Sequence, residues 1–417
     1  MKKIIIEGSN SLSGTIKIGG AKNSLVALIP AAILSEGEIT INNVPNILDK
    51  VSLLEILNLL EINVKEDNQT LIINNKNIKN KLINNKLSKK LRASYYFMGA
   101  LLARFGFVEI YMPGGCKIGQ RPIDLHLDAF EEMGINIKVE GEKYTLDGKN
   151  MHGADINLKF PSVGATINVM LAAVKAKGKT IIENAAKEVE IINIGEFLNK
   201  MGAKISGLGT GKIVINGVNK LASAEISVIP DRIESGTYVI LGALLGKNFT
   251  VDGFIPEYNQ ALLKNLEMMN VEYKIDGHKI EISKDNDISP LDITTGVYPA
   301  FPTDLGQPMQ ILLTQAKGQS FFEETIYETR MMHIQYLNKM GANIINTNMT
   351  ATINGPVKLK GAKLSADDLR GGAALVLAGL IAEGTTEIEN ADFILRGYEN
   401  IINKLSKVGA KIKIEEI

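Results

Sequence analysis

Hydrophobic and polar positions along this chain repeat with a period of about 70 residues, so one order of elements recurs six times. Five similar stretches each end an amphipathic helix and begin a strand, namely FEEMGINIKV, LNKMGAKISG, LEMMNVEYKI, LNKMGANIIN and LSKVGAKIKI. Their matching positions are Met133, Met201, Met269, Met340 and Val408, which are 68, 68, 71 and 68 residues apart. A degenerate copy, LLEINVKED, precedes them and completes the six.

A second signal stays in phase with the first, and it is an apolar helix that ends near a glycine and is followed by a strand. The six glycines are Gly37, Gly106, Gly178, Gly246, Gly318 and Gly384. A glycine in this place suits a left-handed C-terminal cap. Segments such as ATINVMLAAVKA are apolar on all sides, which predicts buried helices. Charged segments such as IIENAAKEVEIINIGEFLNKMG are expected to form the outer helices.

Each unit is therefore expected to contain an apolar helix, a strand, an amphipathic helix and a further strand or hairpin. In EYKIDGHKIEI, Asp276 and Gly277 separate two alternating stretches, which is a strong hairpin signal. The fold class that this order predicts is α/β, with two domains of three repeated βαβαββ-like units each.

The domain boundary is expected near Pro230 in SVIPDRIES, where the fourth unit opens. Residues 1–20 hold an extra strand that has no unit of its own and could pair with the last unit. The predicted first domain is therefore 21–229, and the predicted second domain is 1–20 plus 230–417. The chain would cross between them a second time near Gly19 and Gly20.

Composition indicates a globular protein without a strong electrostatic partner. Lys plus Arg equals Asp plus Glu at 46 each, so net charge recruits neither nucleic acid nor a membrane surface. The apolar run after MKK is three residues long, too short for a signal peptide, and no run reaches the roughly 18 apolar residues of a membrane span. One cysteine excludes an intrachain disulfide and fits a reducing compartment. We expect a cytoplasmic protein, and no metal site, because the four histidines lack metal-ligand spacing.

Polar residues cluster just before the buried helix of every unit. They are Lys22 and Asn23, Arg92, Ser162 and Gly164, Asp231 and Arg232, Thr303 and Asp304, and Asp368 and Arg370. Helix N-termini carry unpaired N–H groups and favour anions, so helices that run in one direction would gather a site for phosphates and carboxylates. Taken singly, such residues are more often ordinary N-caps, surface arginines and turns. Their agreement over six units favours the site.

The only cysteine lies in a glycine-rich loop, MPGGCKIGQRP, at residues 112–122. A free thiol with a pKa near 8.5 is only about 3% thiolate at pH 7. Lys117 and Arg121 would raise that fraction if they lie close to Cys116. The glycines would let the loop move, and Pro122 favours an extended Arg121. The alternative is a small buried hydrophobe or an inert exposed thiol.

At PGGCKIGQRPIDLH the sequence resembles the UDP-N-acetylglucosamine 1-carboxyvinyltransferases, a family of enolpyruvyl transferases. The motifs GGAKNS, ARFG, PSVGAT, ENAAKE, FPTD, ETRMMH, DLRGGAALVLAG and RGYENI also read like this family, in its order and at its spacing. The resemblance covers essentially the whole chain. It implies the enolpyruvyl transferase fold, two inside-out α/β domains with helices inside and sheets outside, and an active site in the cleft between them.

The resemblance also implies an activity. The enolpyruvyl group of phosphoenolpyruvate would pass to the 3′-hydroxyl of UDP-N-acetylglucosamine and release phosphate, in the first committed step of peptidoglycan synthesis. These two small molecules would be the partners, without a cofactor. Two alternatives stay open, namely an enolpyruvyl transferase with another acceptor of the shikimate 3-phosphate type, and a non-enzymatic six-repeat scaffold. Balanced charge argues against a scaffold that encircles nucleic acid.

The resemblance assigns roles to particular residues of this sequence. Cys116 would be the thiol that forms an adduct with phosphoenolpyruvate and donates a proton, and Asp304 the general base. The expected contacts of phosphoenolpyruvate are Lys22, which is also a catalytic candidate, Asn23, Arg121, Arg330, Asp368, Arg370 and Arg396. The expected contacts of the nucleotide sugar are Arg92, Arg121, Pro122, Ile123, Asp124, Leu125, Ser162, Val163, Gly164, Asp304 and Ile326. Phe160 stands where some members carry lysine. The family also implies that fosfomycin, an epoxide that resembles phosphoenolpyruvate, alkylates Cys116.

Overall fold

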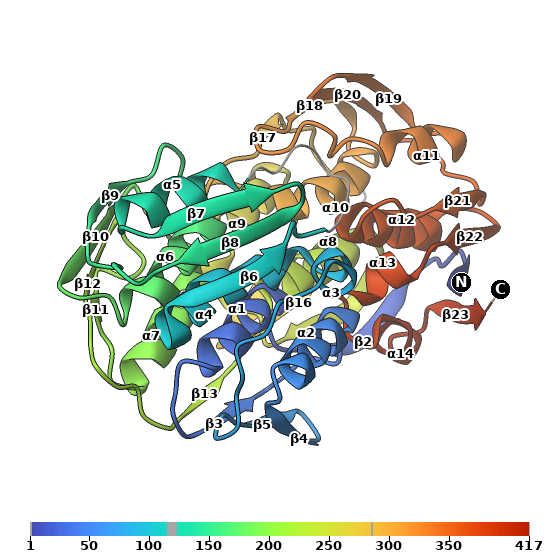
Figure 1. Cartoon of the computed structure of the whole chain (residues 1–417). Coiled ribbons are helices and arrows are strands. Elements are labelled where there is room, and N and C mark those ends of the chain that lie inside the picture. Colours follow the sequence, from blue (N-terminus) through green and yellow to red (C-terminus); the bar gives the residue numbers. More distant parts are fainter. Residues whose placement is uncertain (1, 115–122, 285–286, 417) are drawn as a thin grey trace. The chain divides into compact units, whose positions relative to one another are not determined.

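The computed structural model describes residues 2–114, 123–284 and 287–416, and it divides them into two compact units (Figure 1). We call residues 20–114 with 123–229 the first unit, and residues 2–19 with 230–416 the second unit. The chain leaves the second unit after Gly19 and returns to it at Pro230. The α/β fold class that the sequence predicts is confirmed.

Three apolar helices form the centre of the first unit. They are α1 (Lys22–Ala32), α4 (Tyr96–Phe105) and α6 (Val163–Ala173). Nearly every residue of these helices is buried, because their sequences are apolar on all sides. The longer amphipathic helices are α2 (Leu48–Leu59), α5 (Asp124–Glu132) and α7 (Val189–Lys200). Two short segments, α3 (Asn85–Lys90) and the 3₁₀ helix η1 (Arg92–Tyr95), lead into α4.

The described strands of the first unit form three small sheets. In spatial order they are β13 (Ala224–Ser227), β3 (Glu38–Asn42), β5 (Thr70–Asn74) and β4 (Asn63–Asp67); then β6 (Phe107–Tyr111), β8 (Lys143–Asp147) and β7 (Asn136–Glu140); then β11 (Lys204–Ser206), β12 (Lys212–Asn216), β10 (Lys179–Glu183) and β9 (Asp155–Asn157). Each sheet buries one face of alternating isoleucine, leucine and valine side chains against the helices.

The second unit repeats this plan. Its central helices are α8 (Arg232–Leu245), α10 (Thr303–Leu313) and α12 (Leu369–Ile381), all of them almost wholly buried. The other helices are α9 (Gln260–Met268), α11 (Ile334–Lys339), α13 (Asp392–Leu395), α14 (Ile401–Lys407) and the 3₁₀ helix η2 (Pro256–Tyr258). Helix α10 packs against both α8 and α12, which brings their first turns together.

The second unit also has three described sheets. In spatial order they are β21 (Lys363–Ser365), β22 (Thr385–Glu389), β1 (Lys2–Glu7) and β23 (Lys411–Glu416); then β15 (Tyr273–Asp276), β16 (Lys279–Ile282), β14 (Gly246–Asp252) and β2 (Leu12–Lys17); then β17 (Ile293–Thr294), β18 (Gly318–Glu323), β20 (Thr350–Gly355) and β19 (Asn343–Thr347). The hairpin predicted around Asp276 and Gly277 is β15–β16.

Strands β2 (before Gly19) and β13 (before Pro230) each join the sheet of a different repeat. Strand β2 precedes α1 along the chain but pairs in parallel with β14 of the second unit. Strand β13 precedes α8 but pairs in parallel with β3 of the first unit. The prediction that the first 20 residues pair with the last repeat is confirmed for β1, which lies between β22 and β23. The prediction of a single strand there is wrong, because β2 joins the fourth repeat.

Two local predictions need correction. The segment IIENAAKEVEIINIGEFLNKMG is not one helix, because β10 ends at Glu183 and α7 begins at Val189. Gly106 is the left-handed cap of α4, with φ 68°, but the caps predicted at the other five glycines are wrong. Gly246 has φ −65° and begins β14 directly after α8. The helices before Gly37, Gly178, Gly318 and Gly384 have as their C-caps Ile33, Val174, Thr314 and Ala382. Gly246 is needed for space, because an added Cβ would lie 2.5 Å from the Gly242 carbonyl oxygen.

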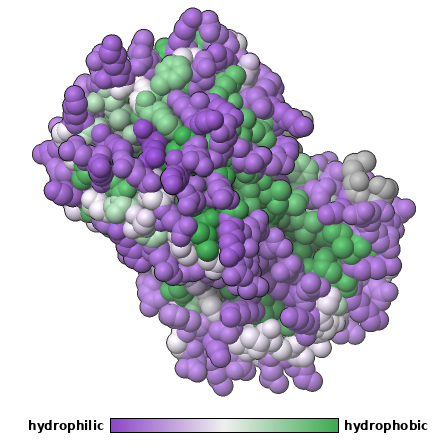
Figure 2. Space-filling model, turned by 60° about the horizontal axis from the view of Figure 1, so that its bottom comes forward, coloured by the Kyte–Doolittle hydropathy of each residue, from purple (hydrophilic) through white to green (hydrophobic). Residues whose placement is uncertain are grey.

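Hydrophilic side chains cover most of the face shown in Figure 2, with hydrophobic patches between them. Among the described residues, no helix is both long enough and apolar enough to cross a membrane.

Candidate active site

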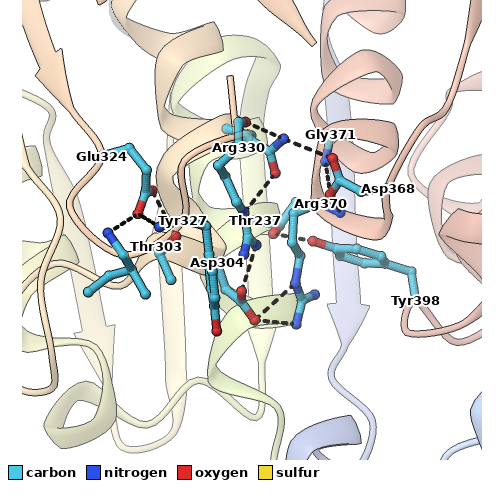
Figure 3. Close-up of polar contacts among 12 residues, drawn as sticks. Thr237, Thr303, Asp304, Glu324, Tyr327, Arg330, Asp368, Arg370, Gly371 and Tyr398 are labelled. Atoms are coloured by element: carbon cyan, nitrogen blue, oxygen red, sulfur yellow. Dashed lines mark hydrogen bonds and ion pairs between the residues drawn. The ribbon is translucent and has the colours of Figure 1, made fainter. Parts of the chain in front are cut away.

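A carboxylate between two buried arginines forms the centre of the candidate site in the second unit (Figure 3). Arg330 Nη2 donates to Asp304 Oδ1 at 2.6 Å. Arg370 donates to Asp304 Oδ2 through Nε at 3.2 Å and through Nη2 at 3.1 Å. The Asp304 side chain is 25% exposed, whereas both arginines are 3% exposed. Asp304 therefore lies between solvent and two buried cations.

The surroundings of the arginines compensate for their burial. Burial is the largest single influence and lowers the pKa of each guanidinium, but Asp304 and the other acidic and phenolic groups nearby together outweigh it, so the pKa of Arg330 and that of Arg370 are both raised. The Arg330 guanidinium carbon lies 5.4 Å from the centre of the Tyr327 ring, and that of Arg370 lies 5.4 Å from the Tyr398 ring. Arg370 Nη1 is buried and has no hydrogen-bond partner among the described residues. A buried, unpaired N–H is costly, so this atom favours an incoming anion.

Asp368 fixes the first turn of α12. As the N-cap, its Oδ1 accepts from the backbone N–H of Arg370 at 2.8 Å and of Gly371 at 3.0 Å. The cap holds the backbone from which the Arg370 side chain projects toward Asp304. Asp368 and Arg370, predicted from one short motif, thus act on the same helix end.

A buried glutamate shapes the loop that carries Ile326 and Arg330. Glu324 Oε1 accepts from the backbone N–H of Ile326 at 2.8 Å and of Tyr327 at 3.2 Å. Its other oxygen accepts from the hydroxyl of Thr303 at 2.7 Å, at the start of α10. Glu324 thereby ties this loop to the helix end that carries Asp304.

The first turn of α8 has its own buried network. Asp231 caps the helix by accepting from the backbone N–H of Ile233 at 2.8 Å and of Glu234 at 3.0 Å. Burial raises the pKa of Glu234, although Lys404 contacts it at 2.6 Å. The Thr237 hydroxyl lies 2.9 Å from the Tyr398 hydroxyl, which joins α8 to the ring beside Arg370. Arg396 follows α13, two residues before Tyr398.

The first unit holds a further candidate cation, Lys22. Lys22 Nζ, at the start of α1, lies 3.1 Å from the buried Asp49 Oδ2. Asn23 follows Lys22 in the same turn. The Ser24 hydroxyl donates to Asn193 of α7, which fixes the N-terminal turn of α1. The structure therefore anchors the Lys22 ammonium group through a buried carboxylate.

Several residues predicted to contact the nucleotide sugar lie around the start of α6. Ser162 caps this helix by accepting from the Ala165 backbone N–H at 3.2 Å, and Val163 and Gly164 form its first turn. A Cβ at Gly164 would lie 2.8 Å from the Tyr95 hydroxyl and 2.9 Å from the His126 ring.

An aromatic cluster continues from Gly164 to Arg92. The Arg92 guanidinium carbon is 5.7 Å from the Tyr95 ring centre, and the Tyr95 and His126 rings meet edge to face at 4.7 Å. Burial and then the charge of Arg92 lower the pKa of His126 to about 3, so the imidazole is neutral. Its Nδ1 accepts from Asn168 Nδ2 at 2.8 Å.

The structure brings together some predicted residues and does not describe others. Asp304, Arg330, Asp368 and Arg370 form one connected cluster in the second unit. Cys116, Arg121 and Pro122 lie outside the described residues. Ile123 is the N-cap of α5, and Asp124 and Leu125 are its first residues. Phe160 is 43% exposed. The described residues include no group of three His, Cys, Asp or Glu side chains that could hold a metal ion.

Sequence reasoning missed four polar residues that complete these clusters. They are Asp49, Gln307, Glu324 and Tyr398. Tyr398 lies in the motif RGYENI, and Gln307 lies one turn beyond Asp304 on the buried helix. A polar side chain within a buried helix is the signal that could have identified Gln307, although Gln310 on the same helix gives the same signal.

Comparisons with known proteins agree over nearly the whole chain. Residues 6–405 match the family model of EPSP synthase (3-phosphoshikimate 1-carboxyvinyltransferase). UDP-N-acetylglucosamine 1-carboxyvinyltransferase 2 of Streptococcus thermophilus is 48% identical and covers 100% of both chains. The protein of that name from Listeria monocytogenes is also 48% identical, covering 98% of this chain and 97% of its own.

Solved structures give the same fold at lower sequence identity. The enolpyruvyl transferase NikO from Streptomyces tendae has a TM-score of 0.90 at 22% identity, over 99% of both chains. EPSP synthase from Acinetobacter baumannii has a TM-score of 0.76 at 16% identity, over 100% of both chains. At these identities the similarity establishes the fold alone.

Proposed function

We propose that this chain transfers an enolpyruvyl group from phosphoenolpyruvate to UDP-N-acetylglucosamine. The reason is that it belongs to the EPSP synthase family and, within it, to the UDP-N-acetylglucosamine 1-carboxyvinyltransferases. The product would be the enolpyruvyl ether at the 3′-oxygen, with release of phosphate. Its place would be the first committed step of peptidoglycan synthesis. The observation that carries the proposal is the Asp304 carboxylate between two buried arginines.

This cluster has the chemistry that phosphoenolpyruvate requires. The substrate carries a carboxylate and a phosphate on a small frame, and guanidinium groups bind such oxyanions with directed pairs of hydrogen bonds. Arg330 and Arg370 are buried, and each guanidinium lies over a tyrosine ring. Arg370 Nη1, without a partner among the described residues, is ready to donate to a further oxygen. The arginines would then bind the substrate carboxylate.

Anion binding at the arginines would also activate Asp304. In this structure the Asp304 oxygens occupy the donors of Arg330 and Arg370. A substrate carboxylate that takes over these donors would leave the Asp304 carboxylate able to accept a proton from the sugar hydroxyl. Substrate binding would thus itself form the general base, because the substrate carboxylate would replace the Asp304 carboxylate at the two arginines.

The addition step then needs an acid for the methylene carbon, the sugar hydroxyl as nucleophile, and a base for the hydroxyl proton. The Cys116 thiol would give its proton to the methylene carbon of phosphoenolpyruvate, while the sugar oxygen bonds to the neighbouring carbon and Asp304 takes the hydroxyl proton. Return of a proton from the new methyl group to the Cys116 thiolate, with cleavage of the carbon–oxygen bond to the departing phosphate, would restore the double bond. Lys22, Asn23, Arg121 and Arg396 are proposed to bind phosphoenolpyruvate.

The nucleotide sugar is proposed to bind along the start of α6 and α5. The first turn of α6, with Ser162, Val163 and Gly164, offers backbone N–H groups to a diphosphate. The remaining proposed contacts are Arg92, Arg121, Pro122, Ile123, Asp124, Leu125, Asp304 and Ile326. That residues of both units act on one pair of substrates stays a prediction.

Release of phosphate with two acceptors tests this proposal. We expect phosphate from phosphoenolpyruvate when UDP-N-acetylglucosamine is present, and none above background with shikimate 3-phosphate. Release of phosphate with shikimate 3-phosphate but not with UDP-N-acetylglucosamine would favour the other acceptor class. No release of phosphate with either acceptor would contradict the proposal.

A further inference from the structure

Gln307 is a buried amide that contacts both sides of the arginine cluster. It lies on α10, one turn after Asp304, and has no exposed surface. Its Nε2 donates to the Arg330 backbone carbonyl at 3.0 Å and to Asp368 Oδ2 at 3.1 Å. Its Oε1 accepts from Arg330 Nε at 3.4 Å. All hydrogen-bonding atoms of this side chain are therefore directed at two predicted site residues.

The contacts with Arg330 fix both its backbone and its side chain. A guanidinium has five donors, and Nη2 of Arg330 is directed at Asp304. The Gln307 oxygen accepts from Nε, the neighbour of Nη2 on the same edge of the guanidinium, and the Gln307 amide nitrogen donates to the backbone carbonyl. The guanidinium is thereby held in the orientation in which Nη2 reaches Asp304.

The contact with Asp368 acts on Arg370. Asp368 uses Oδ1 to cap α12 and Oδ2 to accept from Gln307. Its carboxylate is therefore held in the rotation that lets Oδ1 reach the Arg370 backbone N–H. Gln307 thus supports one arginine directly and the other through the cap of its helix.

The chemistry at this position requires an amide. Two acceptors, the Arg330 carbonyl and Asp368, need donated protons, and one donor, Arg330 Nε, needs an oxygen. An ionised glutamate donates nothing, and an apolar side chain fills the space but leaves three buried polar groups unpaired. Gly371 supports the fit, because a Cβ there would lie 2.9 Å from Gln307 Nε2.

We propose that Gln307 is a positioning residue, which orients Arg330 and, through Asp368, Arg370 for binding the anionic groups of the substrate. The inference rests on the proposed function, because it assigns phosphoenolpyruvate as the anion. In this assignment Gln307 does not contact the reacting atoms. Its effect is on the geometry of the two guanidinium groups.

Three variants separate positioning from general packing. Gln307→Leu removes all three hydrogen bonds, and Gln307→Glu keeps the shape but removes both donated ones. Gln310→Leu is the matched control, because Gln310 lies on the same buried helix and donates only to the Met331 sulfur at 3.3 Å. The readouts are kcat and KM for phosphoenolpyruvate with saturating UDP-N-acetylglucosamine, and the rise in melting temperature that phosphoenolpyruvate causes.

We expect both Gln307 variants to lose about 10- to 100-fold in kcat/KM for phosphoenolpyruvate at pH 7.5, since hydrogen bonds to charged groups are lost. The KM for UDP-N-acetylglucosamine should change far less, and Gln310→Leu should stay within about 3-fold of the native enzyme by the same reasoning. The glutamate variant should recover part of its loss between pH 7.5 and 5.5, because a protonated carboxyl group donates again. The leucine variant should not recover.

Equal behaviour of the Gln307 and Gln310 variants would overturn the proposal, as would a pH-independent loss in Gln307→Glu. Failure of the native enzyme to release phosphate would instead refute the proposed function. The thermal shift still decides the inference in that case. A shift by phosphoenolpyruvate that persists in Gln307→Leu contradicts it, and a shift lost only in the Gln307 variants supports it.

Discussion

At the scale of single residues, the proposed reaction gives Asp304 a second role that conflicts with the one seen in the structure. Its carboxylate neutralises Arg330 and Arg370 in this structure, and the proposed reaction requires it to accept a proton. A carboxylate that accepts hydrogen bonds from two guanidinium groups is a poor base. The proposed exchange with a substrate anion would resolve this conflict, and it would make activation of the base depend on substrate.

Asp304→Asn should therefore lose turnover by about 10²- to 10⁴-fold, the usual contribution of a general base, while UDP-N-acetylglucosamine still binds. The amide keeps the shape but cannot take the proton. Steady-state turnover and calorimetric binding of the nucleotide sugar measure the two effects. Turnover close to that of the native enzyme would mean that Asp304 serves only to neutralise the arginines.

Cys116 offers a second test at this scale, because every thiol-directed reaction of this chain must occur there. We expect fosfomycin to inactivate the enzyme, and to do so faster when UDP-N-acetylglucosamine is bound. Cys116→Asp should resist the epoxide yet retain turnover, since a carboxyl group with a raised pKa can donate a proton. Cys116→Ala should lose turnover. Intact-mass measurement follows the adduct, and an active alanine variant would remove Cys116 from the mechanism.

Two buried histidines predict a pH dependence of stability. Burial and Arg92 lower the pKa of His126 to about 3, and burial lowers that of His333 to about 4 although Asp368 opposes it. The unfolded chain takes up protons below pH 6.5 and the folded chain does not, so stability falls as pH falls from 6.5 toward 4. Each histidine should contribute about 2 kcal/mol of loss between pH 7 and pH 5.

Urea unfolding of the native protein, His126→Gln and His333→Gln at pH 7 and pH 5 measures this contribution. Each variant should lose about 2 kcal/mol less than the native protein over that interval, because glutamine does not titrate. Identical losses in all three proteins would show that other groups cause the acid destabilisation.

At the scale of elements, the hydrophobic periodicity predicted helices and hairpins that depend on local sequence. It missed features that depend on neighbouring elements of the fold. The buried helices followed from segments that are apolar on all sides, and the β15–β16 hairpin from alternation around Asp276 and Gly277. The start of α7 was missed because the motif ENAAKE has the composition of a helix, although a strand precedes it. Gly246 was misread because crowding by neighbouring carbonyl groups leaves no trace in the sequence.

Strand β1 gives a test of how the second unit is closed. It lies between β22 and β23, and its Ile4 and Ile6 are fully buried while Ile5 is half-buried. Ile4→Ala should lower the free energy of unfolding by about 2–5 kcal/mol, because it leaves a cavity in the core. Ile5→Ala is the matched control and should cost clearly less in the same urea titration. Equal costs would contradict the position of β1 inside the sheet.

At the scale of the whole molecule, six repeats with two cores place residues together that are far apart in sequence. Asp304 and Arg370 are 66 residues apart and share two hydrogen bonds, and Gln307 and Asp368 are 61 apart. The six-fold repeat predicted that the starts of α10 and α12 are equivalent positions. It therefore indicated Asp304, Asp368 and Arg370 as candidate site residues. It could not select Gln307, because its partners are set by packing between α10 and α12.

The partner strands of β2 and β13 could not be predicted for a related reason, although the expected boundaries put residues 1–20 in the second domain and 224–227 in the first. Both strands precede a buried helix. In the other described repeats that have such a strand, it pairs with the strand that follows the same helix. Strand β9, for example, pairs with β10, whereas β2 and β13 pair with strands of other repeats. Their sequences contain no sign that they join a different repeat. The exchange depends on how the chain is divided between two units of the same plan, and not on the sequence of either strand.

The product of the reaction tests the central claim most directly. The enzyme would be incubated with phosphoenolpyruvate and UDP-N-acetylglucosamine, and the nucleotide sugar analysed by mass spectrometry and NMR while released phosphate is counted. We predict one enolpyruvyl ether, attached at the 3′-oxygen of the sugar, for each phosphate released. An unmodified nucleotide sugar, or transfer to shikimate 3-phosphate in its place, would contradict the assignment of this chain as a UDP-N-acetylglucosamine enolpyruvyl transferase.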